Sequence, residues 1–201
     1  MKLPALLLSL VAIIAGTSQT NAADSQFKFL EYSYADQNPD FGPFENEKAN
    51  VLLGNIEIDT HVFLSFRYQD GSGQLPIKQE TDKWYSYGIG FNQYITKNLA
   101  AYVSYEQNKV EGSGQFDSIS GPQYNIGLRY TLNDWYFGLE LGYNDVFDNK
   151  YVVGSHSIDG EIIATYEAAY SFYNNFAVVL RIRDTADLDL TSYEVGLRYN
   201  Y

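Results

Sequence analysis

Every second residue is apolar in eight segments of this chain, and this period of two constrains the fold more than any other feature. In each segment every second residue is aliphatic or aromatic, and the residues between them are mostly Gly, Ser, Asn, Arg and Glu. The segments are residues 62–68, 85–91, 99–105, 124–132, 135–143, 162–172, 176–182 and 193–201. Successive side chains of a β-strand point to opposite faces, so this period predicts strands with one apolar face.

Two further strands are predicted before these segments, at about 28–35 and 49–58. Their alternation is poorer because apolar residues occur in both phases, namely Phe27, Phe29, Val51 and Leu53. Counting them gives ten strands, and leaving them out gives eight as the alternative. The sequence therefore predicts an all-β fold, an up-and-down antiparallel barrel of ten strands.

The predicted connections alternate in length along the chain. Short turns are expected near 59–60, 96–98, 133–134 and 173–175, and longer links at about 36–48, 70–82, 107–122, 146–159 and 184–190. Short turns at one end and long loops at the other are typical of bacterial outer-membrane barrels.

Lysine placement indicates which way the apolar face points, because alternation also fits a soluble, lipocalin-like barrel with an apolar interior. A soluble barrel would carry Lys on its wet outer face. The lysines beyond residue 22 are instead expected at strand ends, turns and loops: Lys28, Lys48, Lys78, Lys83, Lys97, Lys109 and Lys150. The pattern therefore predicts a transmembrane barrel with an apolar lipid-facing surface and aromatic girdles.

The first 22 residues have the pattern of a secretory signal peptide. Lys2 precedes an apolar run over 3–15, and small or short residues end at Ala22, where cleavage is expected. The apolar run is too short for a membrane-spanning helix. The barrel domain is then residues 23–201. The chain has no Cys, which excludes a lipoprotein anchor and disulfides.

The C-terminal residues resemble the terminal signal that the barrel-assembly machinery recognises. The matching positions are Glu194, Gly196, Tyr199 and the terminal Tyr201. The chain as a whole is similar to small outer-membrane barrels of the OmpX/Ail, OmpA-barrel and small-porin kind. This resemblance implies periplasmic chaperones and the assembly machinery as partners during biogenesis, outer-membrane lipid and lipopolysaccharide afterwards, and periplasmic termini.

Ionisable residues in the polar phase are the candidate functional residues, since they would face the lumen. The predicted charge network or constriction contains Arg67, Glu106, Arg129, Glu140, Glu167, Arg181, Arg183, Glu194 and Arg198, and Glu31, Glu57 and Glu161 belong to the same phase. Unpaired charge is costly in a confined interior, which favours a network of salt bridges that fills the barrel. The alternative is a narrow channel in which Arg181, Arg183 and Arg198 favour small anions.

Enzymatic activity is not expected, because the two histidines lack the surroundings that catalysis needs. His61 in Asp59-Thr60-His61 resembles the Asp-x-His pair of omptin proteases, but it falls in a short periplasmic-type turn. His156 lies beside Ser155 and near Asp159, yet this spacing on an extended segment does not build a triad. No metal site or cofactor is predicted.

Composition narrows the function classes further. The net charge of −12 disfavours binding to nucleic acid through phosphates. The prediction is a non-enzymatic outer-membrane barrel with a structural or surface role and a narrow, charge-paired lumen. The alternative is a narrow porin for small solutes, which include anions. A more remote alternative is an outer-membrane hydrolase.

Overall fold

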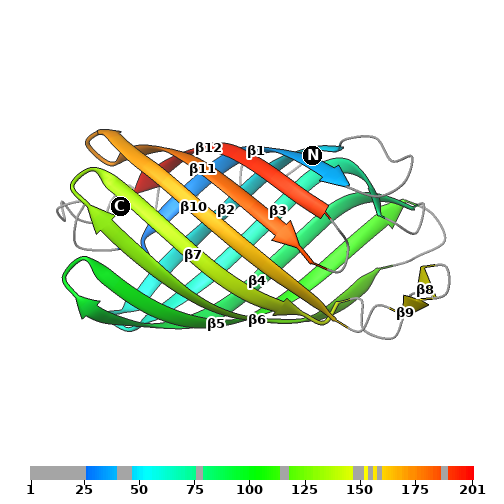
Figure 1. The fold of residues 1–201 in the computed structure, drawn as a ribbon, viewed down its shortest axis with the longest axis horizontal. Helices are drawn as coiled ribbons and strands as arrows, with labels where there is room; N and C mark the ends of the chain where they lie inside the picture. Colours follow the sequence, from blue (N-terminus) through cyan, green and yellow to red (C-terminus); the bar gives the residue numbers. More distant parts are fainter. Residues whose placement is uncertain are drawn as a thin grey trace.

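The computed structural model forms a β-barrel with its strands steeply inclined to the long axis (Figure 1). It describes residues 26–39, 47–75, 79–113, 118–146, 152–153, 156–157, 160–186 and 190–201. Within those ranges, no helix has the length and apolar character needed to cross a membrane. The predicted signal peptide lies outside the described residues.

Ten antiparallel strands close the barrel in the order β1-β12-β11-β10-β7-β6-β5-β4-β3-β2. The strands are β1 Phe29–Pro39, β2 Glu47–Asp59, β3 Val62–Leu75, β4 Gln79–Thr96, β5 Leu99–Ser113, β6 Ile119–Leu132, β7 Trp135–Asn144, β8 Val152–Val153, β9 His156–Ser157, β10 Glu161–Tyr173, β11 Phe176–Thr185 and β12 Leu190–Asn200. The short β8 and β9 pair only with each other. The prediction of an all-β, ten-stranded antiparallel barrel is confirmed.

Several strands extend further than the sequence pattern predicts. The expected links 70–82 and 107–122 are largely strand, because β3 and β5 continue to Leu75 and Ser113. Lys83 and Lys109 therefore lie inside strands, and the expectation that every lysine falls at a strand end, turn or loop is wrong for these two. Backbone pairing continues past the belt of outward apolar residues, where an apolar face is no longer required. The alternation signal therefore ends before the strands do.

Large apolar side chains cover the outer face of the barrel. Tyr87 and Ile126 are each 61% exposed and Leu180 is 58% exposed, whereas Asn92 and Glu31 on the inner face are buried. Exposed apolar surface on this scale is unfavourable in water and favourable against lipid hydrocarbon. The predicted outward orientation of the apolar phase is confirmed, and this surface is suited to contact with lipid.

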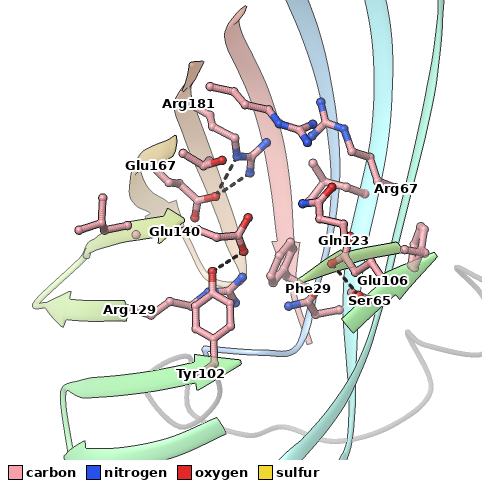
Figure 2. A pocket seen from close by; sticks show the side chains of 17 residues that line it. Phe29, Ser65, Arg67, Tyr102, Glu106, Gln123, Arg129, Glu140, Glu167 and Arg181 are labelled. Atoms are coloured by element: carbon pink, nitrogen blue, oxygen red, sulfur yellow. Dashed lines mark hydrogen bonds and ion pairs between the residues drawn. The ribbon is translucent and has the colours of Figure 1, made fainter. Parts of the chain in front are cut away.

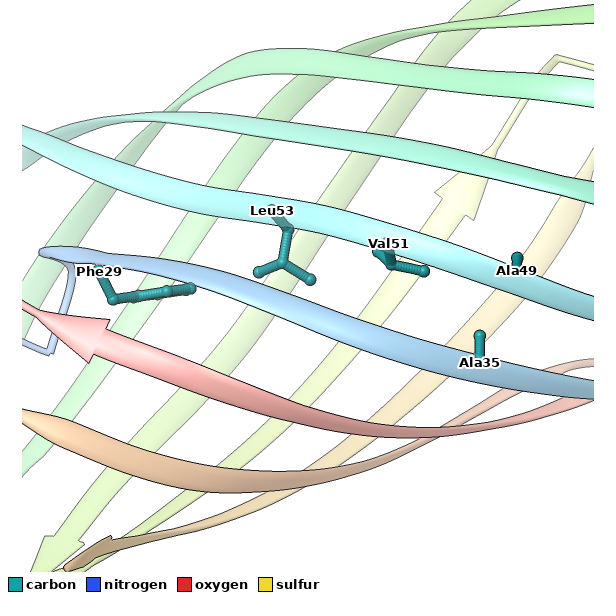
Figure 3. Packing of buried hydrophobic residues seen from close by; sticks show 5 residues of the cluster. All are labelled: Phe29, Ala35, Ala49, Val51 and Leu53. Atoms are coloured by element: carbon teal, nitrogen blue, oxygen red, sulfur yellow. The ribbon is translucent and has the colours of Figure 1, made fainter. Parts of the chain in front are cut away.

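The irregular alternation of the first two strands has a structural cause. Phe29 and Ala35 of β1 and Ala49, Val51 and Leu53 of β2 are buried together (Figure 3). These side chains form an apolar strip on the lumen wall. The inner face is therefore apolar along this strip, which places apolar residues in both phases of β1 and β2.

Tight turns set the register that brings charged residues together. Asn133 and Asn174 adopt left-handed backbone conformations, with φ of 53° and 43°, at two of these turns. Asn tolerates this conformation better than most residues. The turn at Asn174 and a register shift between Ser171 and Tyr173 together place Glu167 of β10 directly opposite Arg181 of β11. Hairpin geometry thus places opposite charges side by side on the inner face.

Candidate functional site

Arg181 of β11 lies at the centre of an ion-pair network inside the barrel. Its guanidinium contacts Glu31 at 2.9 Å, Glu167 at 2.6 Å and Glu194 at 2.7 Å. These carboxylates come from β1, β10 and β12, and Glu167 and Glu194 are the direct cross-strand partners of Arg181. A single buried cation therefore holds three carboxylates from different strands.

Two further arginines complete this network. Arg198 of β12 contacts Glu31 at 2.7 Å and Glu167 at 2.8 Å. Arg67 of β3 contacts Glu194 at 2.5 Å and so reaches across two intervening strands. We call these three arginines and three glutamates the central cluster. Its formal charge is zero, and each carboxylate has at least two contacts with arginine, which offsets the cost of burying the ions.

A cavity of about 110 Å³ lies beside the central cluster (Figure 2). Four charged residues that line it are Glu106 of β5, Arg129 of β6, Glu140 of β7 and Arg183 of β11. In the described part of the chain, none of these four makes a contact ion pair. We call them the cavity charges.

Hydroxyl groups orient the two carboxylates of the cavity charges. Glu106 accepts hydrogen bonds from Ser65 at 3.0 Å and from Ser86 at 2.6 Å. Glu140 accepts one from the Tyr102 hydroxyl at 2.7 Å. Figure 2 shows the Tyr102 and Ser65 bonds entering from different sides of the cavity. Hydrogen bonds to the ionised form stabilise each carboxylate without neutralising its charge.

Aromatic faces hold the two arginines. Arg183 lies 5.9 Å from the ring of Trp84 on β4, and Arg129 lies 5.1 Å from that of Phe29 on β1. The strand order places β11 opposite β4, and β6 opposite β1. Both arginines therefore reach across the lumen. A cation over an aromatic ring is attracted by its electron-rich face but retains its formal charge.

The residues just before β1 turn into the lumen at the end with the short turns. Phe27 is completely buried, stacks on Phe63 with ring centroids 4.7 Å apart, and has Arg129 4.5 Å from its ring centre. Gln26 donates to Thr131 at 2.9 Å, and its carbonyl accepts a hydrogen bond from Arg129. This segment obstructs the lumen at the short-turn end.

All nine charged residues predicted for the lumen face it, and they fall into two sets. Arg67, Glu167, Arg181, Glu194 and Arg198 belong to the central cluster, while Glu106, Arg129, Glu140 and Arg183 are the cavity charges. The pair predicted to act together, Arg181 and Arg183, is therefore divided between the two sets.

The other acidic residues of the predicted phase are also placed. Glu31 joins the central cluster, Glu57 contacts Lys28 at 3.4 Å, and Glu161 is buried at the start of β10.

Sequence reasoning missed the obstructing segment and the aromatic partners of the arginines. Phe27 breaks the alternation of the first strand, and this break was the available signal. Trp84 and Tyr102 face inward. In the neighbouring segments the outward positions are the odd-numbered ones, so the alternation itself places these two residues on the lumen side. Their contacts with Arg183 and Glu140 depend on strands far apart in sequence, so no local pattern could identify them.

The histidines and the C-terminal motif are located as follows. His61 lies at the short-turn end and bonds the carbonyl of Asn92 at 3.1 Å, while Asp59 bonds Thr60 instead. His156 lies in the β8–β9 hairpin, and Ser155 and Asp159 lie outside the described residues.

In the predicted assembly signal, Tyr201 donates to the carbonyl of Asn55 at 3.0 Å and the Tyr199 ring packs on Phe176. Gly196 lies against Ser33, and a Cβ there would overlap that side chain. Glu194 belongs to the central cluster, so this position has a structural contact in addition to its predicted recognition role.

Comparison with known proteins identifies the fold. The solved structure of KdgM porin in complex with disordered oligogalacturonate superimposes with a TM-score of 0.50 at 16% identity, covering 86% of this chain and 99% of that one. The NanC porin gives a TM-score of 0.51 at 9% identity, covering 86% and 100%. The chain shares its fold with outer-membrane porins. No family model matches it, and no curated protein matches its sequence.

Proposed function

We propose that this protein is a narrow outer-membrane channel for small hydrophilic solutes, without enzymatic activity. The cavity of about 110 Å³ beside the central cluster carries this proposal. Protein interiors are close-packed and contain few voids larger than one water molecule. A lumen that served only to hold the barrel together would be expected to fill this space, whereas a solute path requires it.

The central cluster would set the aperture and the selectivity of such a channel. Arg181 and Arg198 are each engaged by carboxylates, so neither presents free positive charge to a passing solute. A preference for anions due to these two residues is therefore not part of the proposal. A neutral cluster favours weak ion selectivity, and a ten-stranded barrel leaves room only for small solutes.

A closed structural barrel is the second candidate, and the contacts that cross the lumen favour it. Arg183 reaches Trp84, Arg129 reaches Phe29 and Arg67 reaches Glu194. Together with Phe27, these contacts obstruct the lumen at several levels. In the channel hypothesis they must rearrange during passage, and in the structural hypothesis they are permanent.

The proposed arrangement in the membrane follows from the ends of the barrel. The short turns and both ends of the mature chain would lie in the periplasm, and the longer connections would face outward beside lipopolysaccharide. In this arrangement the segment around Phe27 closes the periplasmic mouth.

Planar-bilayer recording of the refolded protein tests the proposal. A channel gives stepwise currents, and Phe27→Ala should increase their size or frequency because it removes a buried ring from the mouth. Phe91→Ala is the matched control, since Phe91 is 50% exposed on the outer face. Complete absence of steps in the wild type and in Phe27→Ala would contradict the channel and support the closed barrel.

A further inference from the structure

The cavity charges have no contact ion-pair partner among the described side chains. Glu106, Glu140, Arg129 and Arg183 carry two negative and two positive formal charges but form no contact ion pair in the described ranges. Charges withdrawn from bulk water are costly unless something compensates them. In the central cluster that compensation is direct contact. Around the cavity, hydroxyl donors and aromatic rings supply part of it, and an occupant of the cavity can supply opposite charge.

One part of the cavity wall suits a carboxylate. Arg183 lines the cavity with no hydrogen bond to another described residue. Arg67 also lines it, and its Nε is buried without a partner in the described part of the chain, although its Nη2 binds Glu194. Guanidinium donors are suited to the planar geometry of a carboxylate.

Another part of the wall suits an ammonium group. The carboxylates of Glu106 and Glu140 line the same cavity and accept hydrogen bonds only from hydroxyl groups among the described residues. An ammonium group carries three donors and a positive charge, so it can satisfy oxygens on both carboxylates.

The remaining wall limits the size and character of the occupant. Phe29 and Leu53 of the apolar strip line the cavity and offer contact to an aliphatic group. The cavity volume of about 110 Å³ is suited to a small solute. A molecule with only one charge engages either the arginines or the glutamates of the wall, and not both.

We propose that the cavity binds a small aliphatic zwitterion, a molecule with one carboxylate, one ammonium group and a short apolar side chain, such as a small α-amino acid. Arg183 with Arg67 Nε receives the carboxylate, Glu106 and Glu140 receive the ammonium group, and Phe29 with Leu53 contacts the side chain. This assignment builds on the proposed channel by naming the solute that its cavity recognises.

Trp84 provides a reporter, because Arg183 lies 5.9 Å from its ring. The only other tryptophan, Trp135, lies on the outer face and can be replaced by Phe to leave one emitter. The single-tryptophan protein, refolded in detergent, is titrated with L-alanine, propionate and ethylammonium, and calorimetric titration provides a second readout. L-alanine should bind saturably, at least tenfold more tightly than either single-charge probe.

Variants separate the two ends of the site. Glu106→Gln should weaken L-alanine by about tenfold and leave propionate unchanged, while Arg183→Met should weaken both, as followed by calorimetry. Phe91→Ala on the outer face should change neither. Each variant is first checked for folding by the heat-dependent shift of the barrel on gels.

The outcomes are distinct from those of the conductance experiment. Equal binding of propionate and L-alanine would replace the zwitterion site by a simple anion site, and no saturable binding of any probe would overturn it. Currents without L-alanine binding would contradict only this inference. Binding of L-alanine without currents would support the site and contradict the channel.

Discussion

Removal of the Arg181 side-chain charge tests whether the central cluster stabilises the barrel. Arg181 makes five hydrogen bonds to three buried carboxylates. In Arg181→Met, Glu31 and Glu167 keep Arg198, and Glu194 keeps Arg67, so the cluster changes from neutral to a net charge of −1. Leaving one buried charge uncompensated typically costs about 3–5 kcal/mol. We expect Arg181→Met to lower the free energy of unfolding by that amount.

Arg183→Met is the matched control. Arg183 lies two residues away on the same strand and also faces the lumen, but it has no contact ion pair in the described part of the chain. Its replacement removes the same charge and a similar volume, and we expect a smaller loss, of about 1–2 kcal/mol, because the cavity charges are left at −1 but no contact ion pair is broken. The comparison isolates the contribution of contact with carboxylates from that of the side chain itself.

Equilibrium unfolding in urea, with the barrel folded in phospholipid or detergent and followed by tryptophan fluorescence, provides the measurement. With a slope of about 2 kcal/mol per molar urea, a loss of about 4 kcal/mol lowers the midpoint by about 2 M. Arg181→Met combined with Glu167→Gln restores a neutral cluster and should recover part of the loss. Equal midpoints for Arg181→Met and Arg183→Met would refute the assigned role of the cluster.

Three further predictions follow from individual contacts. Gly90→Ala should destabilise the barrel by about 1–3 kcal/mol in the same urea assay, because the new Cβ would overlap the ring of Phe63. Deletion of Tyr201 should reduce the amount of assembled barrel in outer-membrane fractions, whereas Tyr201→Phe should assemble normally and lose only about 1 kcal/mol with the bond to Asn55; normal assembly after the deletion would contradict the predicted signal. N-terminal sequencing of the exported protein should begin at Ala23, and retention of the first 22 residues would contradict the cleavage prediction.

The fold could be predicted from the sequence because the polarity of each residue in a membrane barrel indicates which face of the barrel it occupies. Leu64 and Ile126 must face lipid, and the residues between apolar positions must face the lumen, so period two reveals strands and orientation without knowledge of their neighbours. Strand ends were predicted poorly because strands outside the lipid belt need no apolar face. Beyond the lipid belt, the strands around Lys83 and Lys109 stay paired through backbone hydrogen bonds, which need no apolar alternation and therefore leave no such pattern in the sequence.

The candidate site was predicted as a list of residues and not as an arrangement. The contact of Glu167 with Arg181 joins neighbouring strands of one hairpin, but its register also depends on a shift between Ser171 and Tyr173 that the sequence pattern does not reveal. The contact of Arg67 with Glu194 joins residues 127 positions apart and depends on closure of the barrel. A pattern within a short stretch of sequence cannot predict a contact between residues so far apart.

The sequence by itself determined that this chain forms ten strands, that its apolar face meets lipid and that its charged residues enter the lumen. Alternation indicates the strands and separates the two faces, and the direction of the apolar face was predicted in addition from lysine, which is absent from the eight alternating segments. Only the tertiary structure decided which charges meet. Closure of the barrel brings Arg181 against three carboxylates, leaves Arg183 beside an open cavity and turns Phe27 into the mouth. These contacts depend on the register and curvature of all ten strands together.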